Sequence, residues 1–210
     1  MKRVSAIFPV LMTVILLVFS SCKETKEADD RANWEERNTD FISGIASGFG
    51  DMTPDKAVKG DSFKLLSFKL DPEKEWGNGS YVYCQVLDQV LEKGSDTISP
   101  YFTDSIRMNY RVRLIPTGNY PEGQVIEQSF KTANLDPAVN IPSSFRVSGL
   151  IDGVATAVMH MRCGDYWKLY IPYGLGYGDN GKGVIPGYSA LIFEVNLTEI
   201  ARNGQDLSPR

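Results

Sequence analysis

Few residues of this 210-residue chain have the types and spacing that acid–base or metal chemistry requires. His160 is the only histidine, and no nucleophile pattern stands beside it, so the sequence offers almost no basis for a catalytic triad. Apart from Cys22, the cysteines are Cys84 and Cys163, which are too few for a metal site. HExxH and EF-hand spacings do not occur. The sequence therefore predicts neither a metal nor a cofactor.

The stretch 176–183, Gly-Tyr-Gly-Asp-Asn-Gly-Lys-Gly, is glycine-rich enough to suggest a phosphate-binding loop. A P-loop needs serine or threonine after its lysine to hold the metal ion, and here Gly183 follows Lys182. The spacing of the upstream glycines is also wrong, which argues against nucleotide binding. Tyr177 lies between two loop glycines, where core packing alone does not account for a tyrosine. Its hydroxyl is a candidate hydrogen-bonding group.

The apolar pattern predicts a short helix and two strands around this loop. From Val154 to Met161 the apolar residues recur at i, i+3, i+4 and i+7, which predicts a two-turn helix. Residues 166–171 and 191–197 alternate between apolar and polar side chains, as half-buried strands do. The connection between them, 172–189, is long, and such loops are uncommon unless they serve a function.

Further elements are predicted upstream. Residues 106–114 alternate strictly, and strands are also expected over 81–88, over 125–130 and over 63–70, with Leu66, Phe68 and Leu70 on one face of the last. Residues 30–49 have helical spacing. We expect this helix to fold back on its own domain, and a homodimer formed through residues 30–49 is the alternative. The fold class that these elements predict is α+β.

The motifs around the glycine-rich loop resemble those of the FKBP-type peptidyl-prolyl isomerases. The matching blocks are Leu150-Ile151-Asp152-Gly153-Val154, Gly164, Lys168-Leu169-Tyr170-Ile171-Pro172, Tyr177-Gly178, Ile185-Pro186 and the final strand 191–197. The resemblance covers residues 80–200 and implies a curved antiparallel sheet wrapped around one short helix. Residues 22–79 would be an amino-terminal extension with helical and strand segments, and 201–210 a tail.

The resemblance also implies a peptide-binding pocket. Tyr177 matches the tyrosine whose hydroxyl binds the substrate carbonyl, Ile151 the residue that offers a backbone N–H, and Glu127 the acidic residue of the site. These three are the catalytic candidates. The pocket walls are expected from Tyr110, Ile126, Leu150, Val154, Val184, Ile185 and Phe193. For Tyr110, Leu150 and Phe193, ordinary core packing remains an equal alternative.

The implied reaction is rotation about an X–Pro amide, which faces a barrier of about 20 kcal/mol. The twisted transition state is less zwitterionic than the planar amide, so a dry pocket disfavours the planar form more. Two positions depart from the family pattern: Val154 replaces the tryptophan of the pocket floor, and Ile126 replaces an aromatic wall. Because an aromatic side chain buries about 150–250 Å², we expect proline to be held less tightly and activity to be reduced.

Residues 1–21 have the organisation of a bacterial lipoprotein signal peptide. A cationic start and an apolar run precede Ser20-Ser21-Cys22, so cleavage before Cys22 and lipidation of its sulfur are expected. The alternative is a plain secretory signal. Loss of Lys2 and Arg3 would change the net charge from −4 to −6, which argues against nucleic-acid binding. Cys84 is expected to be a buried free thiol, although a pair with Cys163 stays open.

Taken together, these observations predict a lipid-anchored isomerase of the cell envelope, with the outer membrane as its expected location. Its partners would be proline-containing segments of exported proteins, whose folding it would assist. Two alternatives remain open. One is a peptide- or protein-binding module that has lost catalysis, and the other is a structural lipoprotein whose active part lies within residues 23–79.

Overall fold

The computed structural model describes residues 30–88 and 98–209. The chain divides into two units, 1–32 and 33–210, and the fold below is that of the second. The predicted signal peptide and Cys22 lie outside the described residues. Within the described part, no helix is both long and apolar enough to cross a membrane.

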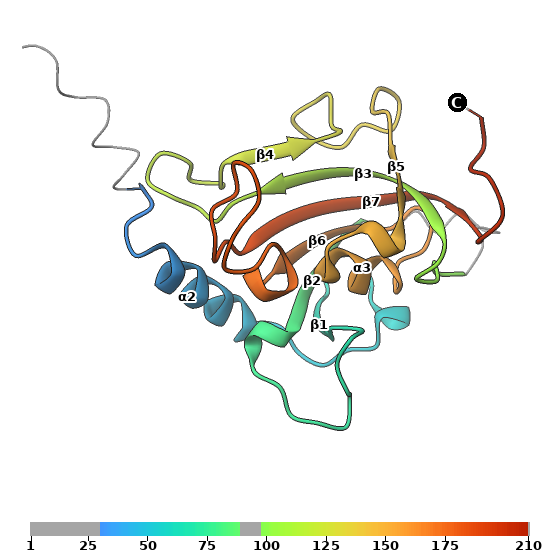
Figure 1. The fold of residues 1–210 in the computed structure, drawn as a ribbon. Helices are drawn as coiled ribbons and strands as arrows, with labels where there is room; N and C mark the ends of the chain where they lie inside the picture. The colour runs from blue at the N-terminus through green and yellow to red at the C-terminus, as the bar shows by residue number, and fades with distance from the viewer. Residues whose placement is uncertain (1–29, 89–97, 210) are drawn as a thin grey trace, which may run out of the picture. The chain divides into compact units, whose positions relative to one another are not determined.

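The described residues of this unit form one antiparallel sheet of seven strands (Figure 1). Six strands are hydrogen-bonded in the order β1-β2-β6-β7-β3-β4, and β5 pairs separately with β3. The strands are β1 (Ser62–Leu66), β2 (Tyr81–Asp88), β3 (Ser105–Arg113), β4 (Val125–Gln128), β5 (Ser143–Arg146), β6 (Tyr166–Ile171) and β7 (Leu191–Ala201). The described residues also form four short 3₁₀ segments between the helices and strands: η1 (Pro54–Lys56), η2 (Asn78–Ser80), η3 (Val147–Gly149) and η4 (Tyr173–Leu175).

Strand alternation places the core on one face of this sheet. In β6, every second side chain from Trp167 to Ile171 is buried, as the period of two predicts. The pairing register between neighbouring strands aligns residues on this face in a row across six strands. The row runs through Phe63, Cys84, Leu169, Phe193, Val112 and Glu127. The row begins in the deepest core and ends at a carboxylate, so the sheet itself brings Glu127 to the rim of the core.

The helix α3 (Asp152–Val158) packs against this face, and its residues 153–158 are all buried. Gly153 allows the close approach, because a Cβ there would lie 2.4 Å from Cγ2 of Ile171. The helix is shorter at its carboxyl end than predicted. After Val158 the chain continues in tighter turns, in which the Met161 N–H donates to the carbonyl of Val158.

The amino-terminal helix α2 (Trp34–Ala46) folds back on its own domain, as predicted. Its Ile42 is buried in a second apolar cluster with Tyr83, Ile115 and Ala190. The other large apolar side chains of the helix, Trp34, Phe41 and Ile45, pack against the same cluster. The apolar side of α2 is therefore used within the chain.

The strand predicted over 63–70 is shorter than expected, and the face that it turns toward the core is the opposite of the predicted one. Phe63 and Leu65 are buried, whereas Phe68 is 37% exposed. The strand ends at Leu66 because the chain then turns, with the Leu70 N–H bonded to the carbonyl of Ser67. Strand β1 pairs with β2, so the sheet continues across residue 80, where the sequence placed the start of the domain.

Cys84 is a free thiol. Cys84 is buried in the main core, where burial raises the pKa of its thiol. The prediction of a buried free thiol at Cys84 is confirmed.

Candidate functional site

Tyr110 and Glu127 form the centre of the candidate site. Val112 pairs with Glu127 across the strands, and residues two apart on a strand share a face, so Tyr110 and Glu127 meet on the core side. The Tyr110 hydroxyl donates to Oε1 of Glu127 at 2.5 Å. Burial, this hydrogen bond and the carboxylate charge raise the pKa of Tyr110 above its ordinary value. Tyr110 therefore remains a neutral hydrogen-bond donor.

A β-bulge in β4 supplies two successive side chains to the site. Glu127 pairs with Val112 and Val125 pairs with Arg113, which leaves Ile126 as an extra residue on its strand. A bulge of this kind interrupts the alternation of faces. It explains how Glu127 reaches Tyr110 while the neighbouring Ile126 also packs against the core.

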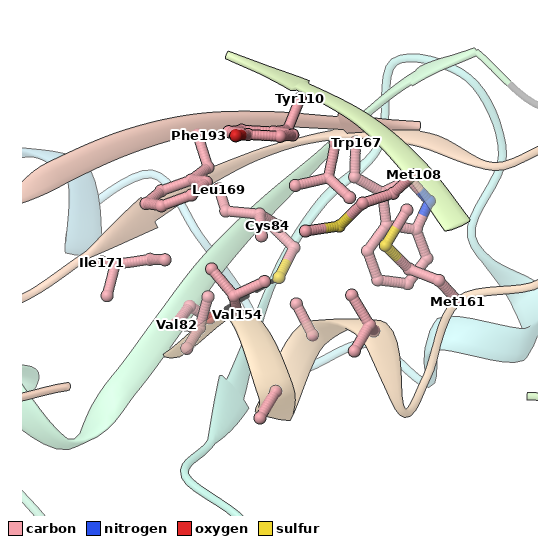
Figure 2. Close-up of a cluster of buried hydrophobic side chains, with 14 of the residues drawn as sticks. Val82, Cys84, Met108, Tyr110, Val154, Met161, Trp167, Leu169, Ile171 and Phe193 are labelled. Carbon is pink, nitrogen blue, oxygen red and sulfur yellow. Dashed lines mark hydrogen bonds between the residues drawn. The ribbon is translucent and has the colours of Figure 1, made fainter. Parts of the chain in front are cut away.

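The ring of Phe145, on β5, packs edge-on against Tyr110 with 5.5 Å between the ring centroids. This aromatic wall was not among the residues predicted from the sequence. The strand that carries it has only four residues, too few for a clear alternation. On the other side of Tyr110, Phe193 pairs with Val112, and Figure 2 shows the rings of Phe193 and Tyr110 near each other.

Tyr177 approaches the same centre from the loop between β6 and β7. Its ring is half-buried and packs against the main core, and Nζ of Lys182 lies 5.3 Å from its centroid. Burial and the charge of Glu127 raise the pKa of Tyr177, so its hydroxyl also stays protonated. Within the described residues this hydroxyl makes no hydrogen bond. It is therefore available to a ligand.

The loop that carries Tyr177 is folded tightly on itself. Lys182 and Ile185 exchange two backbone hydrogen bonds of 2.9 and 3.0 Å, and the Tyr188 N–H donates to the carbonyl of Gly178. Gly187 is needed for this packing, since a Cβ there would lie 1.9 Å from the carbonyl oxygen of Asp179. Gly187 therefore serves close backbone contact.

Ile151 lies at the amino end of α3 with an extended backbone, φ −63° and ψ 150°. Its carbonyl accepts from the Ala155 N–H, while its own N–H has no partner in the part of the chain that the structure describes. Ile151 and the preceding Leu150 are half-buried and pack against the main core. The Ile151 N–H is thus a second unused donor.

The remaining predicted wall residues differ in their exposure. Ile185 and Phe193 are 8% and 6% exposed and lie in the main core. Val154 is 1% exposed, and Figure 2 shows it on α3, directed at the sheet near Cys84. Val184 is 69% exposed. The structure therefore places Val154 beneath the surface and Val184 outside the core.

No three histidine, cysteine or acidic side chains gather closely enough to hold a metal ion in the described ranges. The site instead combines apolar walls with neutral hydrogen-bond donors. Such an arrangement is chemically suited to a peptide carbonyl beside an apolar group and offers no strong acid or base.

A comparison with protein families decides the class of this domain. Residues 99–198 match the model of the FKBP-type peptidyl-prolyl cis-trans isomerases, and all ten predicted pocket residues fall inside that range. Residues 99–198 are thus an FKBP-type domain. The α+β fold predicted from the resemblance is confirmed. The crystal structure of FkpA from Escherichia coli has a similar fold, with a TM-score of 0.54 at 21% identity over 86% of this chain and 65% of that one.

Similar sequences extend the FKBP comparison. A "Macrophage infectivity potentiator" from Trypanosoma cruzi is 28% identical over 208 residues, which cover 98% of this chain and 89% of that protein. An FKBP-type 22 kDa peptidyl-prolyl cis-trans isomerase from Escherichia coli is 36% identical over 113 residues, and the isomerase Mip from Coxiella burnetii 34% over 115. Those two alignments cover 53% and 54% of this chain but only 48% and 44% of the relatives.

Proposed function

We propose that this protein is a peptidyl-prolyl cis-trans isomerase that acts on proline-containing segments of exported proteins. The observation that carries the proposal is the pair of unused donors, the Tyr177 hydroxyl and the Ile151 N–H, beside the nearly buried walls Tyr110, Ile185 and Phe193. The match of residues 99–198 to the FKBP-type family supports the same reaction.

In the proposed mechanism the apolar walls receive the proline ring and the donors hold the neighbouring carbonyl groups. Exclusion of water disfavours the planar, zwitterionic amide more than the twisted transition state. The raised pKa keeps Tyr177 neutral, so it donates to a substrate carbonyl across the physiological pH range. No step needs a proton transfer, in agreement with a site built without a strong acid or base.

Glu127 acts in this mechanism through Tyr110. Its Oε1 accepts the Tyr110 hydroxyl, which fixes the orientation of the ring against Phe145. Glu127 is therefore proposed as a positioning residue for the pocket wall, and Tyr177 and Ile151 as the groups that contact the substrate.

We further propose that the isomerase activity of this chain on short peptides is lower than that of FKBP-type domains with the usual tryptophan on the pocket floor. Val154 is 1% exposed and presents no ring to a proline, and Ile126 provides a smaller wall than an aromatic residue. Phe145 offsets part of this loss, because its ring packs against Tyr110. The proline ring would gain less dispersion and burial on binding.

Isomerisation of a proline tetrapeptide by the full chain tests this function. We expect acceleration above the uncatalysed rate and inhibition by a macrolide that binds FKBP pockets. Valine at position 154, in place of the usual tryptophan, favours one alternative, a peptide-binding domain without turnover. Saturable binding of the tetrapeptide with no acceleration would select that alternative.

We also propose that the protein is lipidated at Cys22 and anchored in the bacterial cell envelope, with the outer membrane as its location. The cationic start, apolar run and small residues before Cys22 support this. Expression in a bacterial host with labelled palmitate should label the chain and place it in the membrane fraction. Cys22→Ser should abolish both results, whereas Cys163→Ser should preserve them; label retained in Cys22→Ser would contradict the assignment.

A further inference from the structure

Asn38 is a buried polar residue in the middle of α2, where asparagine is not favoured in a helix. It is 1% exposed, and both ends of its amide are used. Its Oδ1 accepts from the Ala190 N–H at 2.8 Å, and its Nδ2 donates to the carbonyl of Trp34 at 2.6 Å. Ala190 lies 152 positions away, directly before β7, at the end of the loop that carries Tyr177.

Trp34 makes a second link from α2 to this loop. Its indole Nε1 donates to Oγ of Ser189 at 3.0 Å, and the Ser189 hydroxyl donates to the carbonyl of Pro186 at 2.7 Å. Ser189, the middle residue of this relay, is 3% exposed. Pro186 follows Ile185, which is a wall of the proposed pocket.

The link continues inside the loop to Tyr177. Tyr188 adopts a left-handed backbone, φ +59°, which is unfavourable for a residue with a side chain. Its N–H donates to the carbonyl of Gly178 at 2.9 Å, and Gly178 directly follows Tyr177. The two hydrogen bonds from α2 reach the two residues that directly follow Tyr188, Ser189 and Ala190.

Apolar packing alone would hold α2 against the sheet, since Ile42 and its neighbours form a cluster of their own. Such packing has no direction and does not explain a buried amide aimed at one backbone N–H. We propose that Asn38 and Trp34 are positioning residues, which hold the loop of Tyr177 in the geometry that isomerisation requires. This inference rests on the proposed function. It assigns a role in the active site to a helix outside the matched range 99–198.

Hydrogen exchange of the full chain tests the positioning without reference to activity. Asn38→Ala leaves the Ala190 N–H without its acceptor, so we expect the amides of Gly178, Tyr188 and Ala190 to exchange about tenfold faster. The matched control is Thr39→Ala on the exposed side of the same helix, where the hydroxyl bonds only to the carbonyl of Glu35. It should leave these amides unchanged.

Unchanged exchange of these loop amides in Asn38→Ala would overturn the proposal, as would equal acceleration throughout the sheet. Trp34→Phe provides a second, milder variant, which keeps a ring and removes only the donor to Ser189. If Asn38→Ala does not fold, the same amides are read in Trp34→Phe, with the same two outcomes.

A double-mutant cycle then connects the positioning to catalysis. On a proline tetrapeptide, Asn38→Ala should lower kcat/KM about fivefold, and much less when Tyr177 has already been replaced by phenylalanine. Additive losses would show that Asn38 supports only the fold, and would contradict the positioning role. A wild-type chain without isomerase activity would refute the proposed function alone, because the exchange measurement would still decide the positioning.

Discussion

Glu127→Gln removes the charge at the centre of the site while it keeps the shape of the side chain. In the wild type, the Tyr110 hydroxyl donates to Oε1 of this carboxylate at 2.5 Å. The carboxylate also raises the pKa of Tyr110 and of Tyr177, after the larger effect of burial. With a neutral amide in its place, both pKa values should fall while remaining above the ordinary value because of burial.

The stability effect follows from the change of acceptor. A hydrogen bond to a charged group contributes about 1.5–3 kcal/mol and one between neutral groups about 0.5–1.5 kcal/mol. Since Glu127 is exposed to solvent on one side, screening favours the lower end, and we expect a loss of about 1 kcal/mol. With a slope of about 2 kcal/mol per molar urea, the unfolding midpoint should fall by about 0.5 M.

Two measurements check this expectation: urea unfolding and alkaline titration of tyrosine absorbance. The control is Glu122→Gln, whose side chain is 86% exposed and lies 3.8 Å from Arg113. It should change the free energy of unfolding by less than about 0.5 kcal/mol. If Glu127→Gln left the tyrosine titration unchanged, the proposed contact between this carboxylate and the two tyrosines would be refuted.

Three further predictions concern the loop, the second cluster and the pocket floor. Gly187→Ala would place a Cβ 1.9 Å from a carbonyl oxygen of its own loop, so isomerase activity should fall. The control is Gly174→Ala, where the added Cβ meets no atom within 4 Å and activity should be retained. Equal activities of the two variants would contradict the packing of the loop. Burial raises the pKa of Tyr83 from 10.0 to about 12, so its contribution to stability is complete below pH 10 and is lost as the pH rises toward 12. Urea midpoints from pH 9 to 12 should therefore fall less in Tyr83→Phe than in the wild type. Val154→Trp adds a ring at a site that is 1% exposed, and we expect it to lower the free energy of unfolding by about 1–3 kcal/mol. An unchanged urea midpoint would contradict this and would show that the pocket floor has room for an indole.

Strand periodicity predicted much of the fold because apolar and polar residues alternate along the strands that border the main core. Strand β6 buries alternate residues along its whole length, as its sequence pattern predicts. In β3 and β7 several consecutive residues are buried, although their sequences also alternate. Strand β1 is only five residues long, and the apolar residues after Leu66 belong to a turn. The local sequence pattern does not distinguish the residues of the strand from those of the turn. For this reason the predicted face of β1 was wrong.

The site was harder to predict where it depends on contacts between distant segments. The tyrosine between loop glycines signalled Tyr177, but the bulge that brings both Ile126 and Glu127 to the core is a property of strand register. Phe145 lies on a strand too short to show a pattern. The hydrogen bond between Asn38 and Ala190 spans 152 positions, and the local sequence around either residue does not predict such a partner.

The most direct test of the central claim compares kcat/KM for a proline tetrapeptide among the wild type, Tyr177→Phe and Tyr173→Phe. Tyr173 belongs to the same loop, and its ring packs against Tyr188, a contact that phenylalanine keeps. If the free Tyr177 hydroxyl holds the substrate carbonyl, Tyr177→Phe should lose about tenfold while Tyr173→Phe stays near the wild-type value. No acceleration by the wild type, or equal rates for Tyr177→Phe and the wild type, would contradict the account.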